Sequence, residues 1–164
     1  MKANLLRSLM PLALVFTMIS CSSDATEDQA VNNKLIENYS YNSDELKLAG
    51  LINNYRESIG LNKLDIVNHI SYKSEEHNEY MITNNVVNHD FFEQRSNNIM
   101  TVLGASKVNE NVAYNYSTPE SVLSAWLNSP GHKANIESES TRFGISITPN
   151  PENGRKYYTN IFIR

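Results

Sequence analysis

Apolar residues recur every three or four positions in the middle of the chain, which is the spacing of helices with one buried face. The first predicted helix covers residues 43–59, where Ser43 is placed to cap the start and Gly60 to end the helix in a left-handed conformation. The second predicted helix covers about residues 65–84. Its expected buried stripe consists of Ile66, Ile70, Ser74, His77 and Met81. His69 lies off this stripe and is expected at the surface.

The pattern changes twice further along the chain. Residues 86–109 show no clear period, and an irregular stretch or short helical turns are expected there. A third helix starts with Pro119 at its first position and is ended by the turn at residues 128–131. From residue 143 on, apolar residues alternate in two runs, and Asn153–Gly154 between the runs predicts a hairpin. Helices followed by antiparallel strands indicate an α+β fold.

The first twenty residues resemble an export signal. Lys2 and Arg7 precede an apolar stretch at residues 9–19, which is too short to span a bilayer because spanning takes about 20 apolar residues. Cys21, the one cysteine of the chain, follows directly. This arrangement is similar to the bacterial lipoprotein signal, in which the cysteine becomes the N-terminus and carries acyl chains such as palmitate. The alternative is an ordinary secretory cleavage followed by a free thiol.

Three parts are therefore expected: a lipoprotein signal peptide at 1–20, an acidic and polar flexible tether at 21–42 and a folded domain at 43–164. Removal of residues 1–20 changes the formal net charge from −4 to −6. The mature protein would then be held at its membrane by acyl chains and not by attraction to anionic lipid. The expected location is the cell envelope, at the bacterial outer membrane, its periplasmic face or the cell surface. Because the chain has no basic run, nucleic acid is excluded as a partner.

Four histidines and the carboxylates carry the candidate chemistry, since one cysteine excludes a cysteine-based zinc cluster. His77, on the stripe of the second helix, is interpreted as a core residue. His89 and His132 each follow a predicted helix end, where functional side chains are common. Together with Glu110 they form a set of two histidines and one carboxylate from separate segments. Such a set suits zinc with an open position for water.

Several motifs are similar to those of the CAP superfamily, which includes cysteine-rich secretory proteins, insect antigen 5 and plant pathogenesis-related proteins. Residues 126–136 read WLNSPGHKANI and resemble the WMNSPGHRxNI signature of the bacterial branch. Residues 109–113 read NENVA and resemble the family's GEN(I/L)A motif. Asn88–His89 falls where the family has FSH, and residues 143–147 resemble a family strand. The resemblance covers about residues 45–164.

This resemblance implies a three-layer α-β-α sandwich with a mostly antiparallel sheet, and an open cleft lined by a His-Glu-Glu-His tetrad. His89, Glu110 and His132 take the places of the first His, the first Glu and the second His. Ser129 stands where the family has its second Glu, so the tetrad is incomplete. No disulfide can form within the chain, so packing of the layers must hold the fold.

Three functions remain open at this stage. The favoured one is a membrane-anchored CAP-domain lipoprotein whose cleft binds a divalent cation, a small ligand or both, without catalysis. In it, His89 and His132 hold a cation such as Zn²⁺, while Glu110 orients an imidazole or binds the metal, and the ligand is a lipid, a glycan or a protein. The second is a protease- or esterase-like hydrolase that uses Glu110, His89 and His132; a Ser129–His132 dyad is rejected because nothing orients its imidazole. The third is a structural or interaction module of the envelope.

Overall fold

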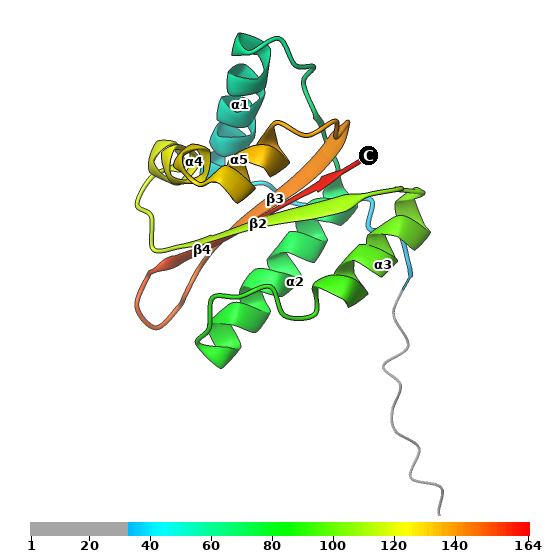
Figure 1. The fold of residues 1–164 in the computed structure, drawn as a ribbon. Coiled ribbons are helices and arrows are strands. Elements are labelled where there is room, and N and C mark those ends of the chain that lie inside the picture. Colours follow the sequence, from blue (N-terminus) through cyan, green and yellow to red (C-terminus); the bar gives the residue numbers. More distant parts are fainter. Residues whose placement is uncertain (1–32) are drawn as a thin grey trace, which may run out of the picture. The chain divides into compact units, whose positions relative to one another are not determined.

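The computed structural model describes residues 33–164, which form a four-stranded sheet between two helical layers (Figure 1). Its elements are α1 (Ser43–Ser58), β1 (Asp65–Ile66), α2 (Asn68–Asn84), α3 (Phe92–Leu103), β2 (Val108–Tyr114), α4 (Pro119–Asn128), α5 (Pro130–Ile136), β3 (Arg142–Pro149) and β4 (Lys156–Ile163). Helices α1, α4 and α5 cover one face of the sheet, and α2 and α3 cover the other (Figure 1). The α-β-α sandwich is confirmed. The predicted signal peptide, Cys21 and residues 22–32 of the tether lie outside the described residues.

The sheet is mostly antiparallel, as expected. Its strand order is β1-β3-β4-β2, with β1 parallel to β3 and the other neighbours antiparallel. Strands β3 and β4 form the predicted hairpin, and Gly154 in its turn adopts a φ of 70°. Apolar side chains fill both faces, with Phe143 on the α1 side and Ile161 on the α2 side. Strand β2 therefore lies at the edge of a sheet that is buried on two sides.

Two predicted boundaries move by a few residues. Helix α1 is capped by Asn42 and not by Ser43: the Asn42 side chain accepts from the Glu45 amide at 2.9 Å, and the Glu45 carboxylate accepts from the Asn42 amide. Helix α2 begins at Asn68 because the Asp65 amide donates to a carbonyl beside β3 at 3.0 Å and draws the preceding residues into β1. Both shifts arise from hydrogen bonds that apolar spacing does not reveal.

Two helices were missed by the sequence interpretation. Helix α3 fills most of the stretch expected to be irregular, because its inner face carries the polar side chains of Arg95, Ser96 and Asn98 beside Ile99, which hides the apolar period. Helix α5 continues directly from α4, with Pro130 at its first position. The expected turn is thus a change of direction between two helices, and His132 lies on the second of them.

Residues 33–42, which the sequence assigned to the flexible tether, pack on the domain as an extended segment. The Tyr39 hydroxyl donates to Glu45 Oε1 at 3.0 Å, and the Tyr41 hydroxyl shares a 3.0 Å hydrogen bond with Ser71. Both tyrosines are half-buried. The tether prediction is wrong for these residues, because aromatic residues scattered through a polar stretch give no period and yet each contacts a polar partner on the domain.

His69 is completely buried, so the prediction that it lies at the surface is wrong. Its Nδ1 accepts the Ile36 amide proton at 3.2 Å, and its Nε2–H donates to Asn98 Oδ1 at 2.8 Å. The segment 33–42 and helix α3 therefore cover the side of α2 that the sequence assigned to solvent. Because one nitrogen of the His69 ring accepts a hydrogen bond and the other donates one, the ring must be in its neutral form.

We expect the domain to lose stability as the pH falls below about 6.5, the ordinary imidazole value. Burial lowers the pKa of His69 and also that of His77, so the unfolded chain takes up these protons first. The stability that the two buried neutral rings contribute is present above the imidazole pKa of the unfolded chain. It is lost as the pH falls from that pKa toward the lower pKa of the folded state. Melting temperatures measured between about pH 8 and about pH 5 should fall less steeply in His69→Gln than in the parent. Equal slopes would contradict this role of His69.

Candidate functional site

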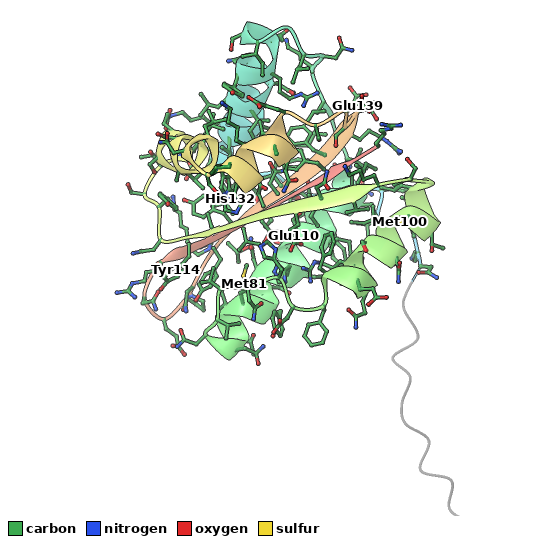
Figure 2. All side chains as sticks on the ribbon, in the orientation of Figure 1. Met81, Met100, Glu110, Tyr114, His132 and Glu139 are labelled. Carbon is green, nitrogen blue, oxygen red and sulfur yellow. The ribbon has the colours of Figure 1, made fainter. Side chains whose placement is uncertain are left out.

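Glu110 lies at the centre of the candidate site, on the edge strand β2 (Figure 2). Side chains alternate along this strand, and Val108 and Val112 pack on the α2 and α3 side whereas Ala113 packs on the α4 side. Glu110 belongs to the first set, and its side chain is only 2% exposed. A carboxylate buried to this extent must have partners, since its desolvation is costly.

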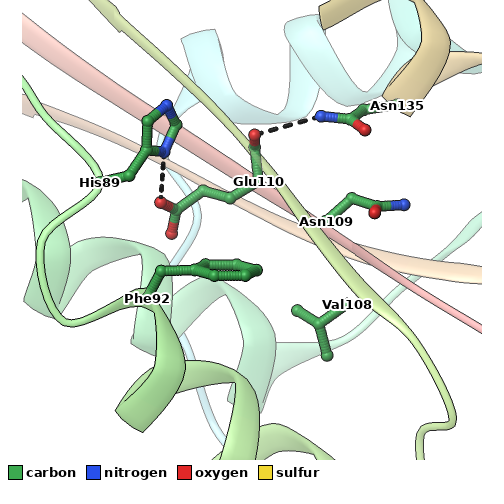
Figure 3. A pocket seen from close by; sticks show the side chains of 6 residues that line it. All are labelled: His89, Phe92, Val108, Asn109, Glu110 and Asn135. Carbon is green, nitrogen blue, oxygen red and sulfur yellow. Dashed lines mark hydrogen bonds and ion pairs between the residues drawn. The ribbon is translucent and has the colours of Figure 1, made fainter. Parts of the chain in front are cut away.

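His89 is the first partner, and it comes from the loop between α2 and α3. Its Nδ1 lies 2.8 Å from Glu110 Oε1 (Figure 3). Because the carboxylate oxygen accepts, we assign the proton to Nδ1 and the lone pair to Nε2. The His89 side chain is 53% exposed, and Nε2 makes no hydrogen bond to any residue of 33–164. This contact is the one expected if Glu110 orients an imidazole, which is one of the two roles considered for it in the sequence hypothesis.

Arg95 of α3 is the second partner, and the sequence interpretation missed it. Its Nε donates to Glu110 Oε2 at 3.0 Å and its Nη2 to Oε1 at 2.9 Å, which is the bidentate arrangement of strong arginine–carboxylate pairs. Its Nη1 donates to the Asp90 carbonyl at 2.8 Å. Because the polar inner face of α3 hides the apolar period of this helix, no spacing in the sequence indicates that Arg95 is buried.

His77 of α2 is a core residue, as predicted, and it also faces Glu110. Its Nε2 lies 3.8 Å from Glu110 Oε1 and donates to the Asn88 carbonyl at 2.9 Å. Its Nδ1 is buried without a hydrogen-bond partner within the described part of the chain. Burial lowers the pKa of His77, so the ring is neutral at physiological pH.

His132 approaches the same edge from the opposite side of β2, on helix α5 (Figure 2). The Asn111 amide donates to the His132 carbonyl at 3.0 Å, and the Asn135 amide donates to Asn111 Oδ1 at 2.8 Å and to the Glu110 carbonyl at 3.2 Å. These bonds fix α5 along β2. The His132 imidazole makes no hydrogen bond to residues 33–164, and burial together with the charge of nearby His89 lowers its pKa.

A pocket of about 260 Å³ opens over this edge of the sheet (Figure 3). Its lining residues are His89, Phe92, Val108, Asn109, Glu110 and Asn135. Phe92 and Val108 give it an apolar wall, and the remaining side chains are polar. His132 lies outside this lining set. The volume is near the lower end for small-molecule sites, so the pocket suits a small ligand.

The donor set around Glu110 does not form a structural zinc centre. Within residues 33–164, no three His, Cys, Asp or Glu side chains are grouped so that they could hold a metal ion. Arg95 and His89 engage both oxygens of Glu110, which argues against Glu110 as a direct metal ligand. That would leave a metal ion only the imidazoles of His89 and His132 in this set, whereas structural zinc takes four protein ligands. The Arg95 guanidinium also places a positive charge close by, which opposes a tightly bound cation.

Ser129, at the position of the missing second carboxylate, joins α4 to α5. Its amide donates to the Trp126 carbonyl at 3.1 Å, and its carbonyl accepts from the Lys133 amide at 2.8 Å. Its hydroxyl makes no hydrogen bond to His132 or to any other residue that the structure describes. The geometry therefore gives no support to a Ser129–His132 dyad.

Comparisons with known proteins agree with this fold. A profile of the cysteine-rich secretory protein family, CAP, matches residues 49–162. An uncharacterized membrane protein of Bacillus subtilis, YlbC, is 31% identical over 128 residues, which are 74% of this chain and 35% of that protein. The chain thus spans about a third of the length of this curated relative. Within residues 33–164, no helix has the length and apolar character needed to cross a membrane.

Solved structures of three bacterial proteins share this fold. An outer surface protein of Borrelia burgdorferi superposes with a TM-score of 0.68 at 20% identity, over 79% of this chain and 98% of that one. An extracellular protein of Bacillus anthracis that contains an SCP domain has a TM-score of 0.65 at 26% identity, over 74% of this chain and 40% of that one. A cysteine-rich secretory protein of Staphylococcus aureus has a TM-score of 0.59 at 20% identity, over 73% and 38% of the two chains.

Proposed function

This chain belongs to the cysteine-rich secretory protein family, and we propose that it is a cell-envelope module that binds a small ligand together with a divalent cation. The proposed site is the pocket lined by His89 and Glu110, together with His132 on the other side of β2, and it acts without catalysis. Since one fold hosts many unrelated activities, the family does not specify the function, and the proposal rests on the site itself.

The arrangement around Glu110 is the observation that carries the proposal. Both carboxylate oxygens are engaged by Arg95 and His89, and two imidazoles near the pocket keep nitrogens without hydrogen-bond partners in residues 33–164. A carboxylate that receives an imidazole N–H fixes the tautomer and leaves the other nitrogen as a ligand. His89 and His132 would hold the cation through these nitrogens, and water would complete its coordination.

Hydrolysis is the weaker alternative. The His89–Glu110 contact has the form of a base and the group that orients it, which would favour a hydrolase if a nucleophile were present. No serine, threonine or tyrosine hydroxyl of residues 33–164 is hydrogen-bonded to His89. Both oxygens of Glu110 already accept hydrogen bonds from Arg95 or His89, which makes this carboxylate a weaker base toward water. We therefore favour binding without turnover.

The proposed location is the outer part of the cell envelope, with a lipid anchor at Cys21. The relative from Bacillus anthracis is described as extracellular and the one from Bacillus subtilis as a membrane protein, which supports an exported protein. An acidic mature chain would not be attracted to anionic lipid, so acyl chains on Cys21 would supply the attachment. Palmitate labelling of the full-length protein, and its loss in Cys21→Ser, tests the anchor.

Zinc binding to the cleft is expected to be saturable, modest in affinity and dependent on both histidines. Calorimetric titration of Zn²⁺ into the exported protein should give a binding isotherm that the double variant His89→Ala/His132→Ala loses. Binding should weaken at acid pH, because protonated imidazole cannot bind a metal. Two protein ligands are the reason for the modest affinity.

Glu93→Gln serves as the matched control for this titration. Glu93 is exposed at the start of α3, beside the pocket residue Phe92, and its side chain contributes no contact to the site. Its loss should leave zinc binding unchanged. Unchanged zinc binding in the double histidine variant would refute the proposed cation site, and absence of binding in the parent would do the same.

A further inference from the structure

The two backbone carbonyls that flank His89 are both held by buried side chains of the helices on either side. His77 of α2 donates from Nε2 to the Asn88 carbonyl at 2.9 Å, and Arg95 of α3 donates from Nη1 to the Asp90 carbonyl at 2.8 Å. The side chain of His77 is fully buried and that of Arg95 is 9% exposed. The loop position of His89 is thus fixed from both ends.

The same two side chains also face Glu110, the partner of His89. Arg95 donates to both of its oxygens, and His77 Nε2 lies 3.8 Å from Oε1. The orientation of His77 leaves its Nδ1 buried without a partner in residues 33–164, which is unfavourable. The free-energy cost of an unpartnered nitrogen is tolerated where the surrounding structure fixes the orientation of the ring, as it does for His77. The interaction that fixes the His77 ring is its hydrogen bond to the Asn88 carbonyl in the His89 loop.

The loop itself is strained and closely tied. Phe91 has a φ of 58°, in the left-handed region that aromatic residues rarely adopt. The Asp90 carboxylate accepts from the Tyr80 hydroxyl at 2.9 Å and from the Asn88 side chain at 2.8 Å. A strained backbone conformation that neighbouring hydrogen bonds maintain, such as that of Phe91, is typical of positions where a functional group is preorganised.

We propose that Arg95 and His77 are positioning residues that hold His89 as the Nδ1–H tautomer, with its Nε2 lone pair available to a ligand. This inference rests on the proposed function and names the ligand class of the site. A lone pair accepts a metal cation, a hydroxyl or an ammonium group, and it repels a carboxylate or a phosphate. With its lone pair on Nε2, His89 therefore favours ligands that offer a metal centre or a hydrogen-bond donor.

The tautomer can be read directly from ¹⁵N shifts of the imidazole nitrogens in the ligand-free protein at about pH 8, above the ordinary titration range. The parent should show His89 as Nδ1–H, the tautomer that a solvated histidine disfavours. Arg95→Gln should shift His89 toward the Nε2–H form. Arg95→Lys should give a smaller shift, because lysine keeps the positive charge but lacks the planar guanidinium that binds both carboxylate oxygens. At the same pH, Zn²⁺ should move the His89 signals and inorganic phosphate should not.

Arg142→Gln is the matched control, since Arg142 is half-buried and donates to the Leu103 carbonyl away from the site. It should leave the His89 tautomer unchanged. If Arg95→Gln folds and His89 stays entirely Nδ1–H, the positioning role is overturned. If Arg95→Gln does not fold, Arg95→Lys and His77→Gln carry the same test. Because the tautomer is read without metal, a failed zinc titration would refute the proposed function and leave this result standing.

Discussion

Gly144→Ala is expected to destabilise the domain by about 3 kcal/mol or more, because the added methyl group would enter backbone and not a flexible side chain. A Cβ at position 144 would lie 2.5 Å from the Ile70 carbonyl carbon and closer still to the Ser71 amide nitrogen. Helix α2 crosses β3 at this point, so the helix or the strand would have to move. Urea unfolding of the variant should show the loss as a lower midpoint with an unchanged slope.

Gly50→Ala is the matched control for this variant. Gly50 lies inside α1, where a Cβ would meet nothing within 4 Å. The same substitution there should stabilise the domain by up to about 1 kcal/mol, because alanine is the better helix former. Equal effects at the two glycines would contradict the close packing of α2 on β3.

The parts of the fold that follow local rules could be predicted from the sequence. Apolar spacing predicted α1, Pro119 at the first helical position predicted the start of α4, and Asn153–Gly154 predicted the hairpin of β3 and β4. Helix α3 could not be found in the same way, because its buried face carries Arg95 and Asn98, whose burial is only favourable with partners from β2 and α2. Such partners are distant in sequence and leave no local pattern.

The candidate site likewise contains some residues that a sequence motif identifies and others that only the folded structure reveals. Motif resemblance brought His89, Glu110 and His132 together, and the structure places the first two in contact and the third across β2. Arg95 and His77 carry no motif that the sequence interpretation could use. Their importance comes from the need of a buried carboxylate for counter-charge and hydrogen bonds, which becomes visible only once the burial of Glu110 is known.

Glu110→Gln is expected to cost about 3–5 kcal/mol of folding free energy, although glutamine has nearly the same volume. The substitution leaves the Arg95 guanidinium buried without its counter-charge, and His89 loses the carboxylate that receives its Nδ1–H. Zinc affinity should fall as well, because a neutral amide oxygen holds the His89 Nδ1–H tautomer less strongly than a carboxylate does. Urea unfolding and zinc titration of the same preparation measure the two effects separately.

The double variant Glu110→Gln/Arg95→Met separates a binding role of this network from a purely structural one. Removing both charges should restore much of the lost stability, since no unpaired buried charge remains. His89 would still face a neutral amide in place of the carboxylate, which orients its ring more weakly, so zinc affinity should stay low in the refolded domain. If stability and parental zinc affinity return together, the network serves only to hold the three segments in place. A restored fold that binds zinc weakly would instead assign to Glu110 the task of preparing His89 for its ligand.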